Sequence, residues 1–212
     1  MRIITLSGGL IMKKSNEKVV KLVLTALFTA IMIIMSTTPL GYLNIGPLAI
    51  TLNVIPLGIA AISLGPVGGS VIGAVFGITS FLQCIGIGGV SAMGTVLFQI
   101  SPVLAFVQRF VPRVLDGLII GLLHKFFVKK AGNKISCFIT GFLAAFINTA
   151  LFITSLFLCF GNTEYIQELV GGRNIIIFIC SFVGINAVFE MIASTIVTGS
   201  IGSALYKAKV IK

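Results

Sequence analysis

The sequence predicts an all-α, polytopic membrane protein, folded as one compact bundle of six transmembrane helices. Hydrophobic side chains make up 57% of its 212 residues and charged ones only 9%, whereas about a quarter of the residues in a soluble domain are charged. Long apolar stretches, close to the roughly 20 residues that cross a bilayer as a helix, follow one another along the chain. We expect transmembrane helices at 19–38, 48–64, 67–85, 111–128, 135–160 and 175–206.

Proline and glycine residues mark the expected helix ends. The first helix ends before Pro39, the second ends at Gly65-Pro66, and Pro112 suits the first turn of the fourth. Residues 89–108 are too apolar for a solvated loop, and Pro102 interrupts any long helix there. We expect a short interfacial or re-entrant segment at 89–108, with a seventh crossing as the alternative.

The basic residues indicate the orientation. Twelve of the 15 Lys and Arg residues lie at the N-terminus, between the fourth and fifth helices, and at the C-terminus. A six-helix topology places all three clusters on one side, whereas a seven-helix topology splits them. Because cytoplasmic loops carry the excess of Lys and Arg, we expect a cytoplasmic segment 1–18, a transmembrane substrate-binding domain 19–207 and a cytoplasmic tail 208–212. Met12-Lys13-Lys14 also has the form of a bacterial start, which would make residues 1–11 an extension.

Several classes of function fit the sequence poorly. The net charge of +10 reflects clusters between apolar segments, not the basic soluble face of a nucleic-acid-binding protein. The four cysteines have no metal-binding spacing, and the single histidine, His124, is expected at the membrane surface. Enzyme motifs such as HExxH or a phosphate-binding loop do not occur. We therefore expect no enzyme, no cofactor and no metal, and any energy for transport would come from a partner.

Polar side chains within the apolar helices predict a binding pocket, because such groups need partners or a purpose inside a bilayer. Glu190 must be protonated, paired with a cation or exposed to a wet cavity. Arg113 and Asp116, three residues apart, fit an intrahelical ion pair and a ligand contact equally well. We expect a pocket for a small polar solute, open to the outside between the last three helices. Its candidate residues are Gln83, Arg113, Asn148, Thr149, Asn186 and Glu190, with rings available from Phe142, Phe146, Phe152 and Phe189.

Small residues recur at every fourth position on two helices, a spacing that lets another helix approach closely. Gly65, Gly69, Gly73 and Gly77 are expected to pack within the bundle. Ala26 and Ala30 lie on the first helix, which a bundle can leave at its edge. Packing within the bundle and docking to a separate membrane protein both fit this alanine pair.

The chain resembles the substrate-binding S components of bacterial energy-coupling factor (ECF) vitamin transporters over nearly all of residues 19–207. The stretch from Pro39 to Ser80 is the most characteristic, and "INTALF" and "INAVFEMIAS" are similar to the family's polar positions on the last two helices. The pattern is most similar to the pantothenate-type branch, while riboflavin, folate and other vitamins stay open as cargo.

The resemblance implies how the protein would work. The face with Ala26 and Ala30 would dock onto a shared transmembrane coupling subunit, which is linked to two cytoplasmic ATPases. The loops 39–47 and 160–174 would close over a vitamin captured from outside, and the protein would then topple in the membrane to release it. For pantothenate, Arg113 is the favoured partner of the carboxylate, ahead of Arg109 and Arg173, and Asn148, Asn186 and Gln83 would meet hydroxyl and amide groups. A self-sufficient carrier or channel, or a ligand-free structural membrane protein, are the competing functions.

Overall fold

The computed structural model describes residues 2–44, 49–172 and 184–211, and nearly all of them are helical, as predicted. One short β-hairpin, absent from the prediction, interrupts the helices. The elements in chain order are α1 (Arg2–Thr37), β1 (Tyr42–Asn44), β2 (Ala49–Thr51), α2 (Val54–Leu82), the 3₁₀ turn η1 (Gln83–Ile85), α3 (Ala92–Ile100), α4 (Pro102–Phe160), α5 (Glu164–Val170) and α7 (Gly184–Lys207).

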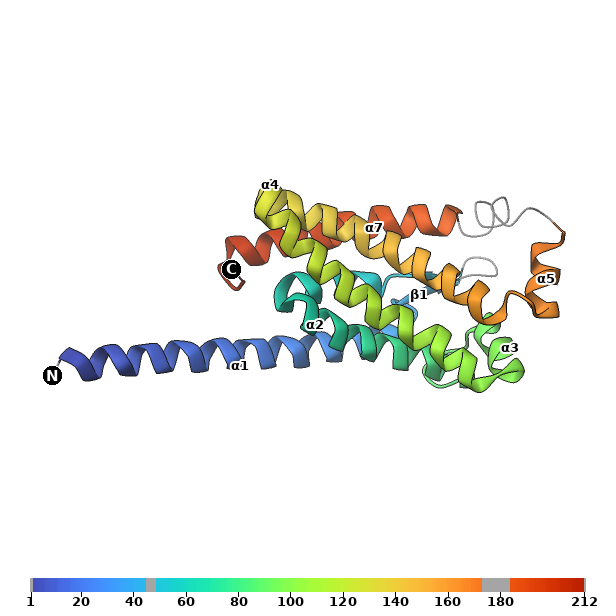
Figure 1. The fold of residues 1–212 in the computed structure, drawn as a ribbon, viewed down its shortest axis with the longest axis horizontal. Coiled ribbons are helices and arrows are strands. Elements are labelled where there is room, and N and C mark those ends of the chain that lie inside the picture. The colour runs from blue at the N-terminus through green and yellow to red at the C-terminus, as the bar shows by residue number, and fades with distance from the viewer. Residues whose placement is uncertain (1, 45–48, 173–183, 212) are drawn as a thin grey trace.

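Four of the described helices are long and apolar enough to cross a membrane: α1 from Glu17, α2, α4 and α7. Two of them are interrupted at a glycine. Gly65 in α2 and Gly132 in α4 both have φ of 75°, a left-handed backbone conformation that glycine adopts without steric cost. Beyond Gly132 the chain of α4 reverses and runs back along the bundle (Figure 1). Both breaks coincide with boundaries that the sequence predicts.

The expected starts of the second and fourth helices are wrong, as is the expected first-turn position of Pro112. Pro102 separates α3 from α4, as predicted, but it stands in the first turn of α4, which a helix tolerates. This helix therefore starts nine residues before the expected 111, and Pro112 lies inside it and not in its first turn. Part of 89–108 forms the separate short helix α3. Residues 49–51, expected to open the second transmembrane helix, form β2, which pairs antiparallel with β1. Of the last predicted helix, the part before 184 lies outside the described residues.

The glycines of α2 and α4 fix how these two helices pack. A Cβ atom on Gly69 would collide with the backbone of Gly117, and one on Gly73 would collide with the carbonyl of Arg113. Such close approach needs residues without side chains. The predicted packing role is therefore confirmed for Gly69 and Gly73, whereas Gly65 serves the helix break. This contact sets the position of Arg113.

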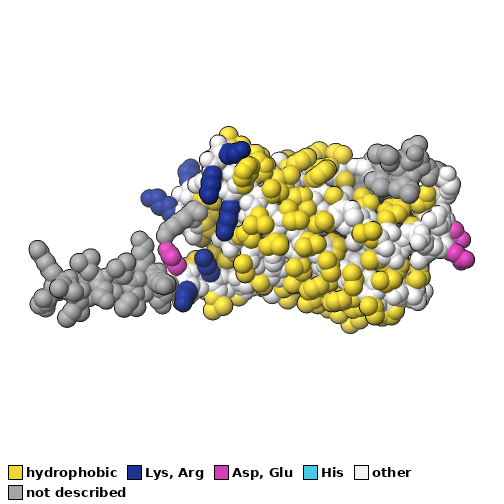
Figure 2. Space-filling model, in the orientation of Figure 1, with side chains coloured by type: hydrophobic (Ala, Val, Ile, Leu, Met, Phe, Trp, Pro, Cys, Tyr) yellow, Lys and Arg dark blue, Asp and Glu magenta, His cyan; other side chains and the backbone are white. Residues whose placement is uncertain are grey.

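The surface divides into two charged ends with an apolar band between them (Figure 2). Lys and Arg gather at the end where both termini of the chain lie. Glu164 and Glu168 on α5 are exposed at the other end. Among the side chains that the structure describes, the exposed lysines are Lys18, Lys21, Lys125, Lys129, Lys130, Lys134, Lys207 and Lys209.

Candidate functional site

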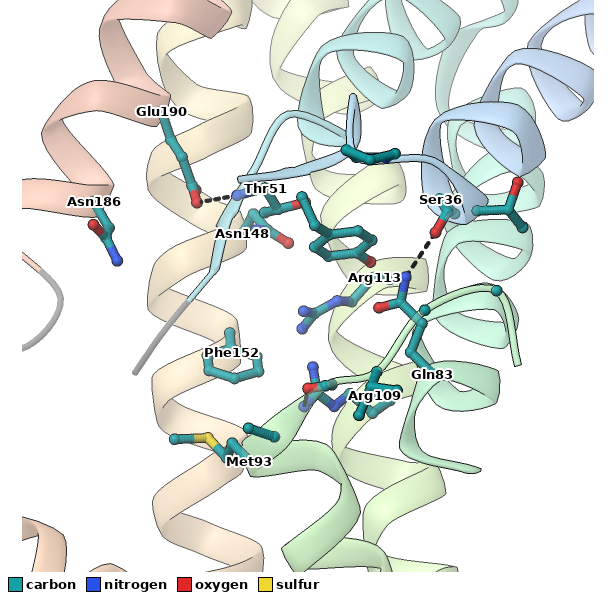
Figure 3. A pocket seen from close by; sticks show the side chains of 18 of the residues that line it. Ser36, Thr51, Gln83, Met93, Arg109, Arg113, Asn148, Phe152, Asn186 and Glu190 are labelled. Carbon is teal, nitrogen blue, oxygen red and sulfur yellow. Dashed lines mark hydrogen bonds between the residues drawn. The ribbon is translucent and has the colours of Figure 1, made fainter. Parts of the chain in front are cut away.

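A cavity of about 530 Å³ lies at the end of the bundle near α3. Its volume falls in the range that is common for small-molecule sites, roughly 300–1,000 Å³. Residues from five regions line it: the end of α1, the β-hairpin, the segment from Gln83 to Met93, both halves of α4, and the start of α7 (Figure 3).

All six predicted site residues line this one cavity: Gln83, Arg113, Asn148, Thr149, Asn186 and Glu190. The cavity is wider than predicted, because α1, the hairpin and residues 88–93 also form its wall. Of the four predicted rings, only Phe152 lines it. Phe142, Phe146 and Phe189 are exposed by 43%, 51% and 49% on the outside of the bundle.

Two arginines, one turn apart on α4, make one side of the cavity positive. Arg113 is only 4% exposed, and its Nε and Nη1 have no hydrogen-bond partner within the described part of the chain. Its guanidinium lies 4.8 Å from the ring centre of Phe152 and 5.3 Å from that of Phe76. Contacts of this kind hold a cation over an aromatic face. Arg113 is therefore held in place with donors left over for another group.

Arg109 is more firmly engaged within the protein. Its Nη2 donates to the hydroxyl of Ser91 at 3.1 Å and its Nη1 to that of Ser80 at 3.5 Å. It also lies 5.5 Å from the ring of Phe152. Arg109 thus adds charge to the cavity, while Arg113 offers the freer donors.

Across the cavity, Glu190 joins α7 to the hairpin. One of its carboxylate oxygens accepts a hydrogen bond from the backbone N–H of Thr51 at 2.6 Å (Figure 3). Asn148, buried beside it, has an amide oxygen without a partner in the described structure. Tyr42, opposite Thr51 in the hairpin, stays uncharged, because burial raises the pKa of its phenol.

Hydrogen bonds also connect the cavity lining to the end of α1. The Gln83 side chain donates to the backbone carbonyl of Ser36 at 2.7 Å, and Thr79 donates to the Ser36 hydroxyl at 3.0 Å. Because its amide nitrogen is engaged in this way, Gln83 keeps its amide oxygen for other partners.

Asp116 lies beside the cavity and not in its lining. It is 0% exposed, and neither of its oxygens accepts a hydrogen bond from any described residue. The ion pair with Arg113, one of the two readings of this spacing, is therefore not formed.

Sequence reasoning missed several lining residues, including Tyr42, Thr51, Ser91 and Met93. Of these, Ser91 could have been predicted from the local sequence. A serine just before an apolar run is a common helix N-cap, and its hydroxyl accepts the N–H of Gly94 at 3.2 Å.

A second polar cluster lies toward the basic end. The expectation of a solvated His124 is wrong: its side chain is 3% exposed. Its Nδ1 lies 2.8 Å from the Thr140 hydroxyl and its Nε2 lies 3.0 Å from the Tyr206 hydroxyl. Thr140 in turn donates to the carbonyl of Ser136 at 2.6 Å. Both ring nitrogens thus have partners.

The outer face of α1 carries the predicted alanine pair. Phe28, Met32 and Ser36, four residues apart, are buried against the bundle, whereas Ala26 and Ala30 are exposed. The face with Ala26 and Ala30 is therefore not used for packing among the described residues.

Comparison with known proteins agrees with this architecture. The family described as "ECF transporter, substrate-specific component" matches residues 20–202. A curated relative, "Pantothenate transporter PanT" of Leuconostoc mesenteroides subsp. mesenteroides, is 31% identical over 201 residues, which cover 90% of this chain and 94% of the relative. "Pantothenic acid transporter PanT" of Lactococcus lactis subsp. cremoris is 31% identical over 211 residues, which cover 93% and 98%.

The family model matches most of the chain, and the curated transporters match it over nearly their full length. The several long apolar helices around a polar cavity agree with these matches. The chain is an integral membrane protein that belongs to the substrate-specific components of ECF transporters.

Proposed function

We propose that this protein captures pantothenate from outside the cell as the substrate-binding subunit of an ECF importer. The observation that carries the proposal is the Arg113 guanidinium, which is buried at the cavity with unpartnered donors. A buried guanidinium needs an anion, and its fork of donors matches a carboxylate. Pantothenate has one carboxylate, and both relatives bear its name.

The rest of the cavity suits the remainder of that molecule. Pantothenate also carries an amide and hydroxyl groups, which need both donors and acceptors. Asn148, Asn186 and Thr149 offer both, the Gln83 amide oxygen is an acceptor, and Glu190 accepts from hydroxyls. We place the carboxylate at Arg113 and the hydroxyls toward Glu190.

The topology that fits this role has six membrane crossings with both termini in the cytoplasm. The breaks at Gly65 and Gly132 divide α2 and α4 into two crossings each, which with α1 and α7 makes six. The lysines gathered at the end with the termini support a cytoplasmic location for that end. The cavity then lies toward the outside.

The exposed face with Ala26 and Ala30 is the proposed docking surface for the transmembrane coupling subunit, through which two ATPases would supply energy. Small residues allow a partner helix to approach closely, and this face is not covered by the described bundle.

The ligand is tested by calorimetry of the purified, detergent-solubilised protein against a panel of B vitamins. We expect pantothenate to bind tightly and riboflavin, folate and the others not to bind. Tight binding of another vitamin instead of pantothenate would overturn the choice of cargo, and no binding at all would leave a structural role.

Docking is tested by Ala26→Trp, whose bulky ring would keep a partner helix away. We expect vitamin binding by the purified variant to be unchanged and uptake by cells to be abolished. Ala150→Trp is the matched control, because Ala150 is an exposed alanine on α4 and its substitution should leave uptake intact. Normal uptake with Ala26→Trp, or uptake by vesicles that contain this chain alone, would contradict the proposed coupling.

A further inference from the structure

Asp116 is the single aspartate in the chain, and its environment is unusual for a carboxylate. It lies on α4 one turn from Arg113, with no exposed surface and no hydrogen-bond donor on either oxygen among the described residues. A buried ion without partners is strongly unfavourable. A carboxylic acid in such a place is favoured in its uncharged form.

The groups around Asp116 offer it little compensation. On α4 itself, Arg109 and Arg113 are the nearest cations along the helix, and His124 lies about two turns away with both nitrogens engaged. On the other elements, Tyr42 of β1 and Glu190 of α7 line the cavity together with Arg113, whereas α2 has no Asp, Glu, Lys, Arg or His in its sequence. The returning half of α4 has none either from 135 to 160, where only Cys137 and Cys159 can titrate.

The charge of the site depends on its two buried carboxyl groups, Asp116 and Glu190. Arg109 and Arg113 contribute two positive charges, because guanidinium groups stay charged in proteins. Glu190 accepts a short N–H hydrogen bond, which stabilises a carboxylate. With Glu190 as a carboxylate, the site carries one net positive charge when Asp116 is uncharged and none when Asp116 is ionised.

We propose that Asp116 holds a proton both in the free protein and in the complex, and that this proton gives the cavity the single positive charge that matches a monoanion. This inference rests on the proposed function and concerns the selection of the ligand by charge. Bound pantothenate, with one carboxylate, then makes the site neutral overall. An ionised Asp116 would instead leave an uncompensated negative charge buried next to the ligand.

The protonation state can be measured directly because the aspartate is unique. Protein made with ¹³C-labelled aspartate should show, at neutral pH, an infrared carbonyl band of a protonated carboxylic acid that shifts with the isotope. Asp116→Asn should remove the band, and Glu164→Gln, at an exposed carboxylate on α5, should not. A labelled carboxylate band with no acid band would overturn the proposal. This measurement needs no ligand, so it is independent of whether pantothenate is the cargo.

Calorimetry with pantothenate supplies a second test. Asparagine has the shape and charge of a protonated aspartate, so we expect Asp116→Asn to bind within about threefold of the unmodified protein. If Asp116 were ionised, removing its charge would tighten binding of the anion by more than about tenfold, and that result would refute the proposal. Absence of binding in the unmodified protein would refute the cargo assignment while leaving the infrared result decisive for Asp116.

Discussion

The two buried polar clusters of this protein differ in how well their groups are satisfied. Arg113 and His124 lie on the same half of α4, about three turns apart, and both are almost completely buried. The imidazole of His124 has a hydroxyl partner at each nitrogen. The guanidinium of Arg113 has aromatic rings on its faces but donors without acceptors.

This difference distinguishes a structural cluster from the proposed ligand site. A buried network that satisfies itself joins helices and leaves nothing for a ligand. A buried cation with unused donors beside a cavity is costly unless something from outside completes it. Burial and polarity are common to both clusters, whereas, in the described structure, the unmet hydrogen bonds and the adjoining cavity are found only at Arg113.

The largest effect on binding is expected from Arg113→Ala. Truncating one member of a buried, hydrogen-bonded charge pair costs about 2–5 kcal/mol, so pantothenate affinity should fall at least about 30-fold. Arg113→Lys should be intermediate, because lysine keeps the charge but lacks the planar fork. The melting temperature in detergent should change little, since Arg113 makes no hydrogen bond through Nε or Nη1 in the described structure. Unchanged affinity in calorimetry would remove Arg113 from the site.

A smaller effect is expected from Phe152→Leu, which removes the ring shared by the two arginines. Cation–π contacts contribute about 0.5–2 kcal/mol, so affinity should fall about twofold to thirtyfold. Phe142→Leu is the matched control, because that ring is exposed on the outside of the bundle, and its affinity should be unaltered. Equal losses in the two variants would show that the ring does not orient the arginines.

The smallest effect on binding is expected from Tyr206→Phe, which deletes one partner of His124. The loss of this hydrogen bond should lower the free energy of unfolding by about 0.5–1.5 kcal/mol, as measured by denaturation in detergent. Pantothenate affinity should stay the same, because Tyr206 does not line the cavity. A loss of affinity comparable to that of Arg113→Ala would erase the distinction between the two clusters.

Much of this arrangement could be predicted from the sequence. Apolar length gave the helices, and the glycines at 65 and 132 lie at expected boundaries, because helix breaks depend on local chemistry. The six candidate residues meet at one cavity because polar groups within apolar helices turn toward one another and away from lipid.

What escaped prediction depends on contacts between distant segments. The hairpin consists of two three-residue strands, too short for a pattern of alternation. The hydrogen bond between Glu190 and Thr51 joins residues 139 positions apart in the chain. The burial of His124 was not predicted, because its neighbour Lys125 suggests an exposed position. Its partners Thr140 and Tyr206 lie 16 and 82 residues away in the sequence.

The hydrogen bonds from Gln83 and Thr79 to Ser36 make the end of α1 part of the cavity wall. The same helix turns its opposite side, with Ala26 and Ala30, toward the surroundings. Any tilt of α1 relative to its neighbours must therefore move one wall of the cavity in which we propose that pantothenate binds.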